Sequence, residues 1–339
     1  MLKFQSIIKQ AAIVSLAAIG LQAQAAGLEK RTFCVFDPIG AKGPAYDSMQ
    51  DYKAAALDWG VELELKAYTN ENVALEDFKA KKCDAVGLTG TRARPFNKFT
   101  ATIEAVGALN DYSQMKSLLK MLAKPKAAKY MTSGNYEIAG IVPGGAIYVF
   151  VRDQKIDSIE ATAGKRLATL EHDQASIKVV NQIGATMVPV SIATFAPRFN
   201  NGDVDIAYAP AIAYEPFEMH KGLNKNGGIY NFNLAQMNGQ LIIHKGRFPK
   251  GFAQSSREYT AKNFDKAMEQ IRLAEKGIPE KYWLDLPAEK KAEYKELLRQ
   301  IRIQLMADGV YDRKMLKLML KLRCKDNPAH HECVEKLEG

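Results

Sequence analysis

The chain is poor in the residues and motifs that most catalytic sites need. It has five histidines and four cysteines in 339 residues, and it contains no Gly-x-Ser-x-Gly, His-Glu-x-x-His or P-loop motif. His172 beside Asp173 is an isolated pair in a predicted loop, and such a pair without a nucleophile rarely does chemistry. The sequence therefore predicts a protein that is not an enzyme and that carries no cofactor.

Charge of one sign is only in modest excess. Lys and Arg number 47 against 38 Asp and Glu, and the basic residues do not form the stripe that tracks nucleic-acid phosphates. The densest basic group lies in residues 313–325, among Met and Leu residues at helical spacing. This pattern predicts an amphipathic helix with a solvated basic face, and a membrane-surface or partner helix is the alternative. We expect no nucleic-acid partner.

Long apolar runs are absent after the N-terminus, because charges interrupt every apolar stretch. Residues 1–25 have the layout of a cleaved signal peptide: Lys3 and Lys9, an apolar segment over 11–20, and the small-x-small site Ala23-Gln24-Ala25. The apolar segment is too short for an uncleaved membrane anchor, which is the alternative. We therefore predict export to the periplasm.

The four cysteines predict two disulfides in an oxidising compartment. Cys324 and Cys333 flank a short polar loop with a proline, and Cys34 and Cys83 lie on predicted strands that are often neighbours. A zinc site using these cysteines with His330 and His331 is the alternative, but their spacing matches no tight metal motif. We expect no metal site.

Two segments share one pattern. In residues 75–87 and 196–208, a phenylalanine precedes an aspartate by six positions across a polar turn, and apolar residues follow. The pairs are Phe78 with Asp84 and Phe199 with Asp205. This is typical of a helix end, a tight turn and a buried strand, so one such unit in each half of the chain predicts two related α/β lobes.

The alternation of strand and helix patterns sets the expected organisation. Strands at 31–37, 61–68 and 83–88 alternate with helical segments, which predicts a parallel sheet covered by helices. A β-type run over 138–152, broken by Pro143-Gly144-Gly145, is expected to cross between lobes. The expected limits are 26–143 plus 237–285 for lobe I, 144–236 for lobe II and 286–339 for C-terminal helices. Further strands are expected at 165–170, 186–190, 205–208 and 240–244, and helices at 46–59, 113–128, 176–183, 255–274, 288–306 and 313–322.

Part of the chain resembles the TRAP-type periplasmic solute-binding proteins. Residues 156–168, with Gly164-Lys165 before a strand, resemble one segment of that family, and residues 183–190 and 195–205 resemble two others. In overall pattern the chain looks closest to the AdeT-type solute-binding proteins. The resemblance implies two doubly wound α/β lobes around a ligand cleft, here with a helical C-terminal extension. It also implies a small-molecule ligand and a membrane permease as partners.

The chain departs from the TRAP pattern where that family binds ligand carboxylates. The position of its clamping arginine falls on Ala168, a second basic position falls on Tyr148, and a common asparagine falls on Ala209. Alanine cannot make the bidentate arginine–carboxylate contact. We therefore expect that simple dicarboxylates and sialic-type acids bind weakly or not at all.

Candidate ligand contacts lie where strands end, because binding clefts of two-lobed α/β proteins collect these ends. Each has a structural alternative: the arginines could be rim charges, the tyrosines half-buried packing and Asp37 a helix cap. The candidates are Asp37, Arg92, Arg94, Tyr148, His172, Tyr208 and Tyr214.

The leading hypothesis is a periplasmic solute-binding protein that captures a small organic ligand and delivers it to a membrane transporter. The alternative is an exported accessory protein of an envelope transport or efflux complex, which uses the same fold without a carboxylate site.

Overall fold

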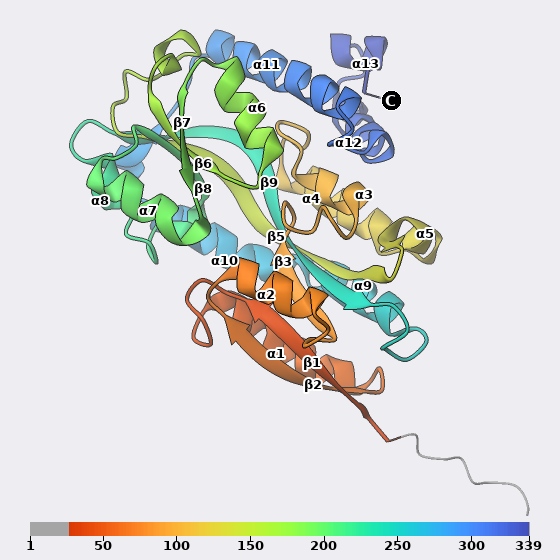
Figure 1. The fold of residues 1–339 in the computed structure, drawn as a ribbon. Helices are drawn as coiled ribbons and strands as arrows, with labels where there is room; N and C mark the ends of the chain where they lie inside the picture. The colour runs from red at the N-terminus through yellow and green to blue at the C-terminus, as the bar shows by residue number, and fades with distance from the viewer. Residues whose placement is uncertain (1–26, 339) are drawn as a thin grey trace, which may run out of the picture.

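The computed structural model describes residues 27–338 (Figure 1). The predicted signal peptide, residues 1–25, lies outside these residues. Within residues 27–338, none of the helices is both long and apolar enough to cross a bilayer.

The first part of the chain forms a parallel three-stranded unit, shown at the bottom of Figure 1. Strands β1 (Glu29–Phe36), β2 (Val61–Tyr68) and β3 (Ala85–Thr89) pair in the order β2-β1-β3. Helices α1 (Pro44–Leu57) and α2 (Glu71–Lys79) make the connections. These elements match the predicted ones closely, because alternating patterns and turn residues mark each boundary.

Two long antiparallel strands run through the middle of the molecule. Strand β5 (Tyr136–Val151) pairs with β9 (Gly228–His244) along its length, and β9 also pairs with β3. The Pro143-Gly144-Gly145 sequence shifts the register without ending β5, and Gly145 has a φ of +101° that favours glycine. The prediction of a strand over 240–244 alone was too short. Residues 228–230 and 235–239 also pair with β5, although they lack a clear alternation.

The second unit extends the same sheet from the other side of β5. Strand β8 (Ile206–Pro210) pairs antiparallel with β5, and β6 (Arg166–Leu170) lies between β8 and β7 (Thr186–Val190) in parallel. Helices α6 (Gln174–Gln182) and α7 (Ile192–Asn201) connect these strands. The sheet order is β2-β1-β3-β9-β5-β8-β6-β7, so the molecule has two lobes joined by β5 and β9. We keep the predicted limits as names for lobe I, lobe II and the C-terminal helices.

The structure has two helices where the sequence predicted a single helix over residues 255–274, so that prediction is wrong. Helix α9 (Phe252–Lys262) ends at Asn263, whose side chain donates to the Tyr259 carbonyl oxygen, and α10 (Phe264–Gly277) begins after it.

The C-terminal helices span both lobes. In Figure 1, α11 (Ala288–Ala307) lies beside α6 of lobe II, whereas α12 (Arg313–Asp326) packs on α4 (Tyr112–Leu122) of lobe I. The remaining elements are α3 (Lys98–Ala101), α5 (Ala128–Met131), α8 (His220–Leu223), α13 (His331–Glu335), β4 (Thr132–Ser133), β10 (Trp283–Leu284), and the 3-10 turns η1 (Thr102–Glu104), η2 (Pro125–Ala127), η3 (Glu160–Thr162), η4 (Ala211–Ala213) and η5 (Glu280–Tyr282).

Both predicted disulfides are present. Cys34 of β1 is bonded to Cys83 just before β3, with Cα atoms 5.9 Å apart, and Cys324 is bonded to Cys333 with a Cα separation of 5.6 Å. The described part of the chain has no free cysteine. The zinc alternative is therefore contradicted, because it required free thiolates.

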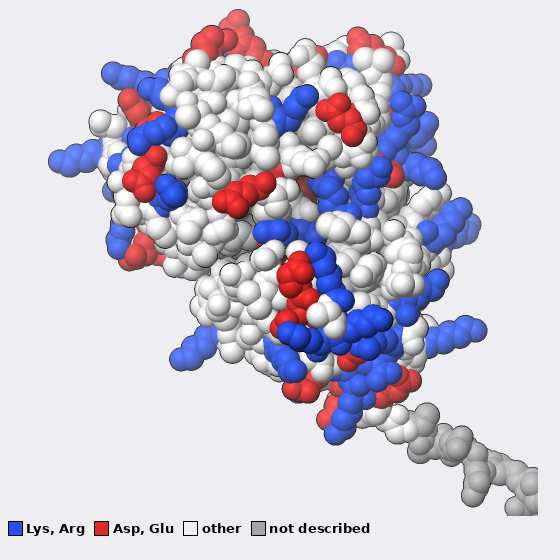
Figure 2. Space-filling model, in the orientation of Figure 1, with Lys and Arg blue, Asp and Glu red and all other residues white. Residues whose placement is uncertain are grey.

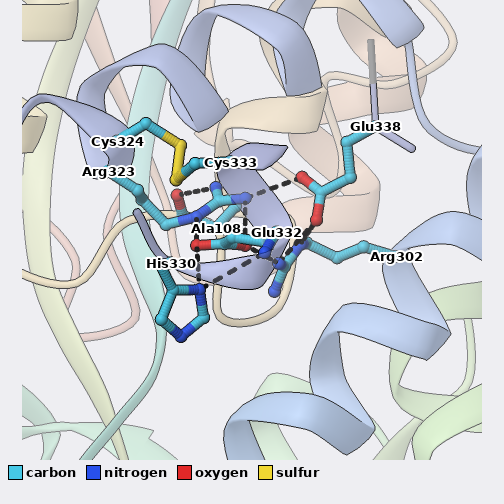
Figure 3. Close-up of a disulfide and its surroundings, with 8 residues drawn as sticks. All are labelled: Ala108, Arg302, Arg323, Cys324, His330, Glu332, Cys333 and Glu338. Atoms are coloured by element: carbon cyan, nitrogen blue, oxygen red, sulfur yellow. Dashed lines mark hydrogen bonds and ion pairs between the residues drawn. A yellow bond between two sulfur atoms is a disulfide. The ribbon is translucent and has the colours of Figure 1, made fainter. Parts of the chain in front are cut away.

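A buried ion-pair cluster holds the chain's C-terminal end beside the second disulfide (Figure 3). Arg302 of α11 and Arg323 of α12 share Glu338, with Nη2–Oε distances of 2.6 and 2.8 Å. Arg323 also pairs with Glu332, and its Nη1 donates to the carbonyl oxygen of Ala108 at 2.6 Å. Each charge in this cluster has a partner, as burial requires. The cluster fastens the C-terminal helices to the segment around residue 108.

The amphipathic helix predicted at residues 313–322 is confirmed in α12. Met315, Leu316, Met319 and Leu320 are buried, while Lys and Arg side chains lie along the outer face. Figure 2 shows blue side chains grouped along the upper right edge, where Figure 1 places α12. Arg323 departs from this pattern, because it turns inward to the ion-pair cluster.

Candidate functional site

A cavity of about 110 Å³ lies where lobe I, lobe II and the C-terminal helices meet. Lobe I contributes residues 91–106, lobe II contributes residues 147–235, and the C-terminal helices contribute residues 286–311. Because no single part encloses this space, its shape depends on how the parts pack together. Its walls are mainly apolar, and polar side chains gather in one group.

The apolar walls come from the faces of β5 and α6. Ile147, Val149 and Val151 are alternate residues of β5, so they point to the same side of the sheet. Val179 and Ile183 are four residues apart and share one face at the end of α6. The other apolar and aromatic lining residues are Val106, Ile156, Leu167, Ala175, Val180, Ile206, Tyr230, Phe232, Leu234, Ala235, Leu286, Tyr294, Leu297, Leu298 and Tyr311.

The polar residues that line the cavity come from all three parts of the molecule. Thr91 and Arg94 follow β3, Glu104 ends η1, and Asp173 begins α6. The carboxylate of Asp173 caps α6 by accepting the N–H of Ala175 at 3.1 Å. Ser176, Tyr208 and Tyr311 line the cavity close by, while Thr162 adds a hydroxyl on the lobe II side. We call Arg94, Glu104 and Asp173 the charged cluster of the cavity.

Glu104 is the most buried carboxylate of the charged cluster, with 7% of its surface exposed. Its Oε1 accepts the backbone N–H of Asn238 at 2.8 Å. Burial raises the pKa of Glu104 to about 8, and the nearby charge of Asp173 adds to this rise, while the Asn238 N–H and Arg94 oppose it. The negative form of Glu104 is thus costly at this buried position, and a nearby cation would stabilise it.

Arg94 is held in place by the C-terminal helices. Its Nη1 donates to the carbonyl oxygen of Val310 at 2.7 Å, and its guanidinium lies 5.5 Å from the ring centre of Tyr311. The Tyr311 hydroxyl accepts from the N–H of Val106 at 3.4 Å, and Arg302 donates to the Val106 carbonyl at 3.0 Å. The buried ion-pair cluster therefore supports the cavity wall through Val106.

Comparison with known proteins agrees with this architecture. The family model described as "Solute-binding protein AdeT 1/2" matches residues 53–338. The probable solute-binding protein AdeT1 of Acinetobacter baumannii is 42% identical over 299 residues, which cover 88% of this chain and 98% of that protein. This chain belongs to the AdeT 1/2 family of solute-binding proteins. A second relative, the probable solute-binding protein AdeT2 of the same organism, is 26% identical over 67% of this chain and 96% of its own length.

Solved structures show that the AdeT 1/2 chain has the fold of TRAP periplasmic solute-binding proteins. One from Desulfovibrio salexigens, with bound orotic acid, has a TM-score of 0.72 at 13% identity, covering 87% of this chain and 99% of its own. One from Sulfitobacter sp. NAS-14.1, with bound β-D-galacturonate, has a TM-score of 0.70 at 14% identity, with the same coverage. The expected two-lobed fold is confirmed, and the solute-binding family indicates a binding rather than an enzymatic role.

Two of the predicted site residues line the cavity of this AdeT 1/2 protein, namely Arg94 and Tyr208. The Tyr208 hydroxyl accepts the N–H of Leu170 at 3.2 Å, and burial raises its pKa. Its ring forms part of the wall between the apolar and polar regions. Both remain candidates for ligand contact.

Arg92 and His172 are next in the chain to polar residues that line the cavity, but they do not line it themselves. Arg92 faces the buried Glu71, with an Nε–Oε2 distance of 3.7 Å, and Glu71 in turn accepts from the N–H and hydroxyl of Thr89 at 2.7 Å. Burial, together with the charge of Arg92, lowers the pKa of His172 to about 4. Arg92 therefore faces a buried carboxylate, so the charge pair expected as the alternative is present, but inside the protein and not at the rim.

The other three candidates point away from the cavity. Asp37 accepts the N–H groups of Ile39, Ala45 and Tyr46 at 2.9–3.0 Å, so it caps the loop and first turn of α1. Tyr148 faces the opposite side of β5 from Val149, where its hydroxyl donates to Glu275 at 2.8 Å. Tyr214 is buried in the core between the sheet and the helices α7 and α8.

Sequence reasoning missed Glu104, Thr91 and Tyr311 as cavity residues. Glu104 lies in a segment without a recognisable motif or periodic pattern. Tyr311 falls in the connection between the helices predicted at 288–306 and 313–322. A glutamate among apolar neighbours was the one available signal, because such a residue is rarely buried without a reason. Ala168 of β6 is 2% exposed and packs in the core of lobe II, so this position does not line the cavity.

Proposed function

We propose that this protein captures a small organic ligand in the cavity between its lobes and delivers it to a membrane transporter from the periplasm. The observation that carries the proposal is that both lobes and the C-terminal helices jointly enclose the cavity. A ligand that contacts all three parts favours the arrangement that brings them together. Binding thereby shifts an equilibrium between open and closed forms.

The two strands that join the lobes suit such a movement. In β5 the pairing with β9 shifts at Ile138, Pro143 and Ile147, so the connection is irregular near the middle of the sheet. The positive φ of Gly145 marks a backbone position where other residues would be strained. A hinge built on a few such positions absorbs rotation without breaking the sheet.

The test starts with the protein purified from the periplasm. Native mass spectrometry should find a retained small molecule, and small-angle scattering should show compaction when that molecule is added back to stripped protein. Tyr208→Ala should weaken its binding about ten- to hundredfold with little change in melting temperature. Tyr148→Ala is the matched control, because Tyr148 faces away from the cavity.

Failure of every arm would support the alternative, an accessory protein of an envelope transport or efflux complex. In that case no small molecule is retained, no compaction occurs, and Tyr208→Ala behaves as the wild-type protein in cells.

A further inference from the structure

We infer that the ligand is a small amphipathic amine, with an apolar body about the size of one ring and a cationic head placed at Glu104 and Asp173. This inference rests on the proposed function and names the class of molecule that the cavity accepts.

The size and lining of the cavity define the body of the ligand. The cavity measures about 110 Å³, which is smaller than the apolar cavity of about 150 Å³ known to bind benzene, so the body of the ligand can be no larger than one ring. Four strands and two helices supply aliphatic and aromatic side chains to its walls. The Tyr230 hydroxyl in this region already donates to the carbonyl oxygen of Gln154 at 2.9 Å. A sugar or polyol would bury several hydroxyls here with few partners, which is costly.

The charged cluster defines the head of the ligand. Arg94 is the one basic lining residue, and it faces two acidic lining residues, Glu104 and Asp173. Part of its hydrogen-bonding capacity goes to the Val310 carbonyl and its face lies toward Tyr311. Arg92, two residues before Arg94 in the chain, faces Glu71 and does not line the cavity. Arg94 therefore balances one carboxylate of the charged cluster, and Glu104 ionises readily only beside a second cation, which the ammonium group of the ligand would supply.

The geometry of Glu104 favours the same assignment. Its Oε1 is held by the Asn238 N–H, whereas no hydrogen bond to its Oε2 is found among residues 27–338. Asp173 approaches the same region from α6, and its charge raises the pKa of Glu104, Tyr208 and Tyr311 alike. A ligand carboxylate placed here would lie beside the charge of Asp173 and the buried Glu104, with only Arg94 to oppose it. An amine instead donates to both.

The experiment compares three probes of matched size and one smaller probe by isothermal titration calorimetry on the full-length mature protein. Benzylamine has the body and the cationic head, benzyl alcohol has a neutral head, benzoate has an anionic head, and methylammonium has the head without the body. We expect benzylamine to bind at least about tenfold more tightly than each of the other three.

Two variants connect the result to named residues. Glu104→Gln keeps the acceptor for Asn238 and removes the charge, so it should weaken benzylamine about tenfold and leave benzyl alcohol unchanged. Asp173→Asn preserves the cap of α6 and provides a second test if the first variant does not fold. Glu71→Gln is the matched control, because Glu71 is also buried but does not line the cavity.

Several results would overturn the inference. Benzoate binding as tightly as benzylamine would show that Arg94 dominates, which is compatible with the proposed function but not with an amine ligand. Unchanged benzylamine affinity in Glu104→Gln and Asp173→Asn would show that the head lies elsewhere. If none of the probes binds while native mass spectrometry finds another retained molecule, the amine class is wrong and the proposed function stands.

Discussion

The two lobes are built around the same helix–turn–strand unit, and the two copies differ in what secures them. Phe78 in lobe I and Phe199 in lobe II are both fully buried. Asp84 accepts the N–H of Thr32 at 2.9 Å and donates its own N–H to the carbonyl of Thr32 at 2.9 Å. Asp205 makes the same pair of bonds to Arg166, at 2.9 and 2.8 Å. Each aspartate thus ties the start of its own strand to the neighbouring strand, β1 in lobe I and β6 in lobe II.

The difference lies in the covalent bond and in the partner arginine. In lobe I the disulfide from Cys83 holds β3 to β1, and Asp84 pairs with Arg247, which is 163 residues away in the chain. In lobe II the described residues contain no disulfide, and the guanidinium of Arg166 itself pairs with Asp205 at 2.8 Å. The comparison teaches that one local pattern forms the same turn in two settings, while long-range contacts decide how firmly each copy is anchored.

Removing the buried phenylalanines tests whether the two units are equivalent, and it should have the largest effect. Phe78→Ala and Phe199→Ala should each lower the free energy of unfolding by about 3–5 kcal/mol, because each leaves a cavity in a packed core. Urea denaturation followed by circular dichroism measures the loss. A loss below about 1 kcal/mol at either position would show that the two units are not built alike.

Removing the disulfides tests the covalent difference. Replacing Cys34 and Cys83 together by alanine should cost about 3–4 kcal/mol, and replacing Cys324 and Cys333 should cost about 1 kcal/mol less, because the second loop is shorter. Urea midpoints of the two double variants give the comparison. Protein from the periplasm should show no reactive thiol after denaturation, and four reactive thiols would contradict both bridges.

The aspartates allow a finer comparison of the anchors. Asp84→Ala and Asp205→Ala should each cost about 1–2 kcal/mol through the lost charge-assisted bond to a strand N–H. The Arg166 side chain holds the pKa of Asp205 below its usual range, so its stabilisation is complete above about pH 4 and is lost as the pH falls further. Unfolding curves at pH 3 and 7 measure this loss, and Asp205→Ala should reduce the difference between them. An unchanged difference would refute this role.

The histidines give the smallest and most specific effect, in a higher pH window. Burial lowers the pKa of His172 in lobe II to about 4 and also lowers the pKa of His244 in lobe I. Below about pH 6.5 the unfolded chain binds protons that the folded protein does not, so stability should fall from pH 6.5 toward pH 4.

His172→Gln should therefore flatten part of the decline in urea midpoint between pH 7 and pH 4.5, with His244→Gln as the comparison in the other lobe. A decline as steep as that of the wild-type protein would mean that His172 is not the neutral buried group described here.

The candidate site could be predicted only in part. Tyr208 and Arg94 follow strand ends, which sequence patterns locate well, and both line the cavity. Tyr148 was misplaced because a strand residue faces one side or the other according to its register, and a shift of one residue reverses the face. Glu104 and Tyr311 reach the cavity through segments that have no periodic pattern of their own.

The sequence by itself determined most of the local elements, the two repeated units and the resemblance to solute-binding proteins. The elements and the repeated units follow from short-range spacing: apolar alternation, glycine and proline turns, and capping aspartates. The tertiary structure alone decided where the cavity lies and which charges meet there. Lobe I supplies Glu104 and Arg94, lobe II supplies Asp173, and α11 closes the space. The physical reason is that burial and charge pairing depend on neighbours far apart in the chain, which no local pattern specifies.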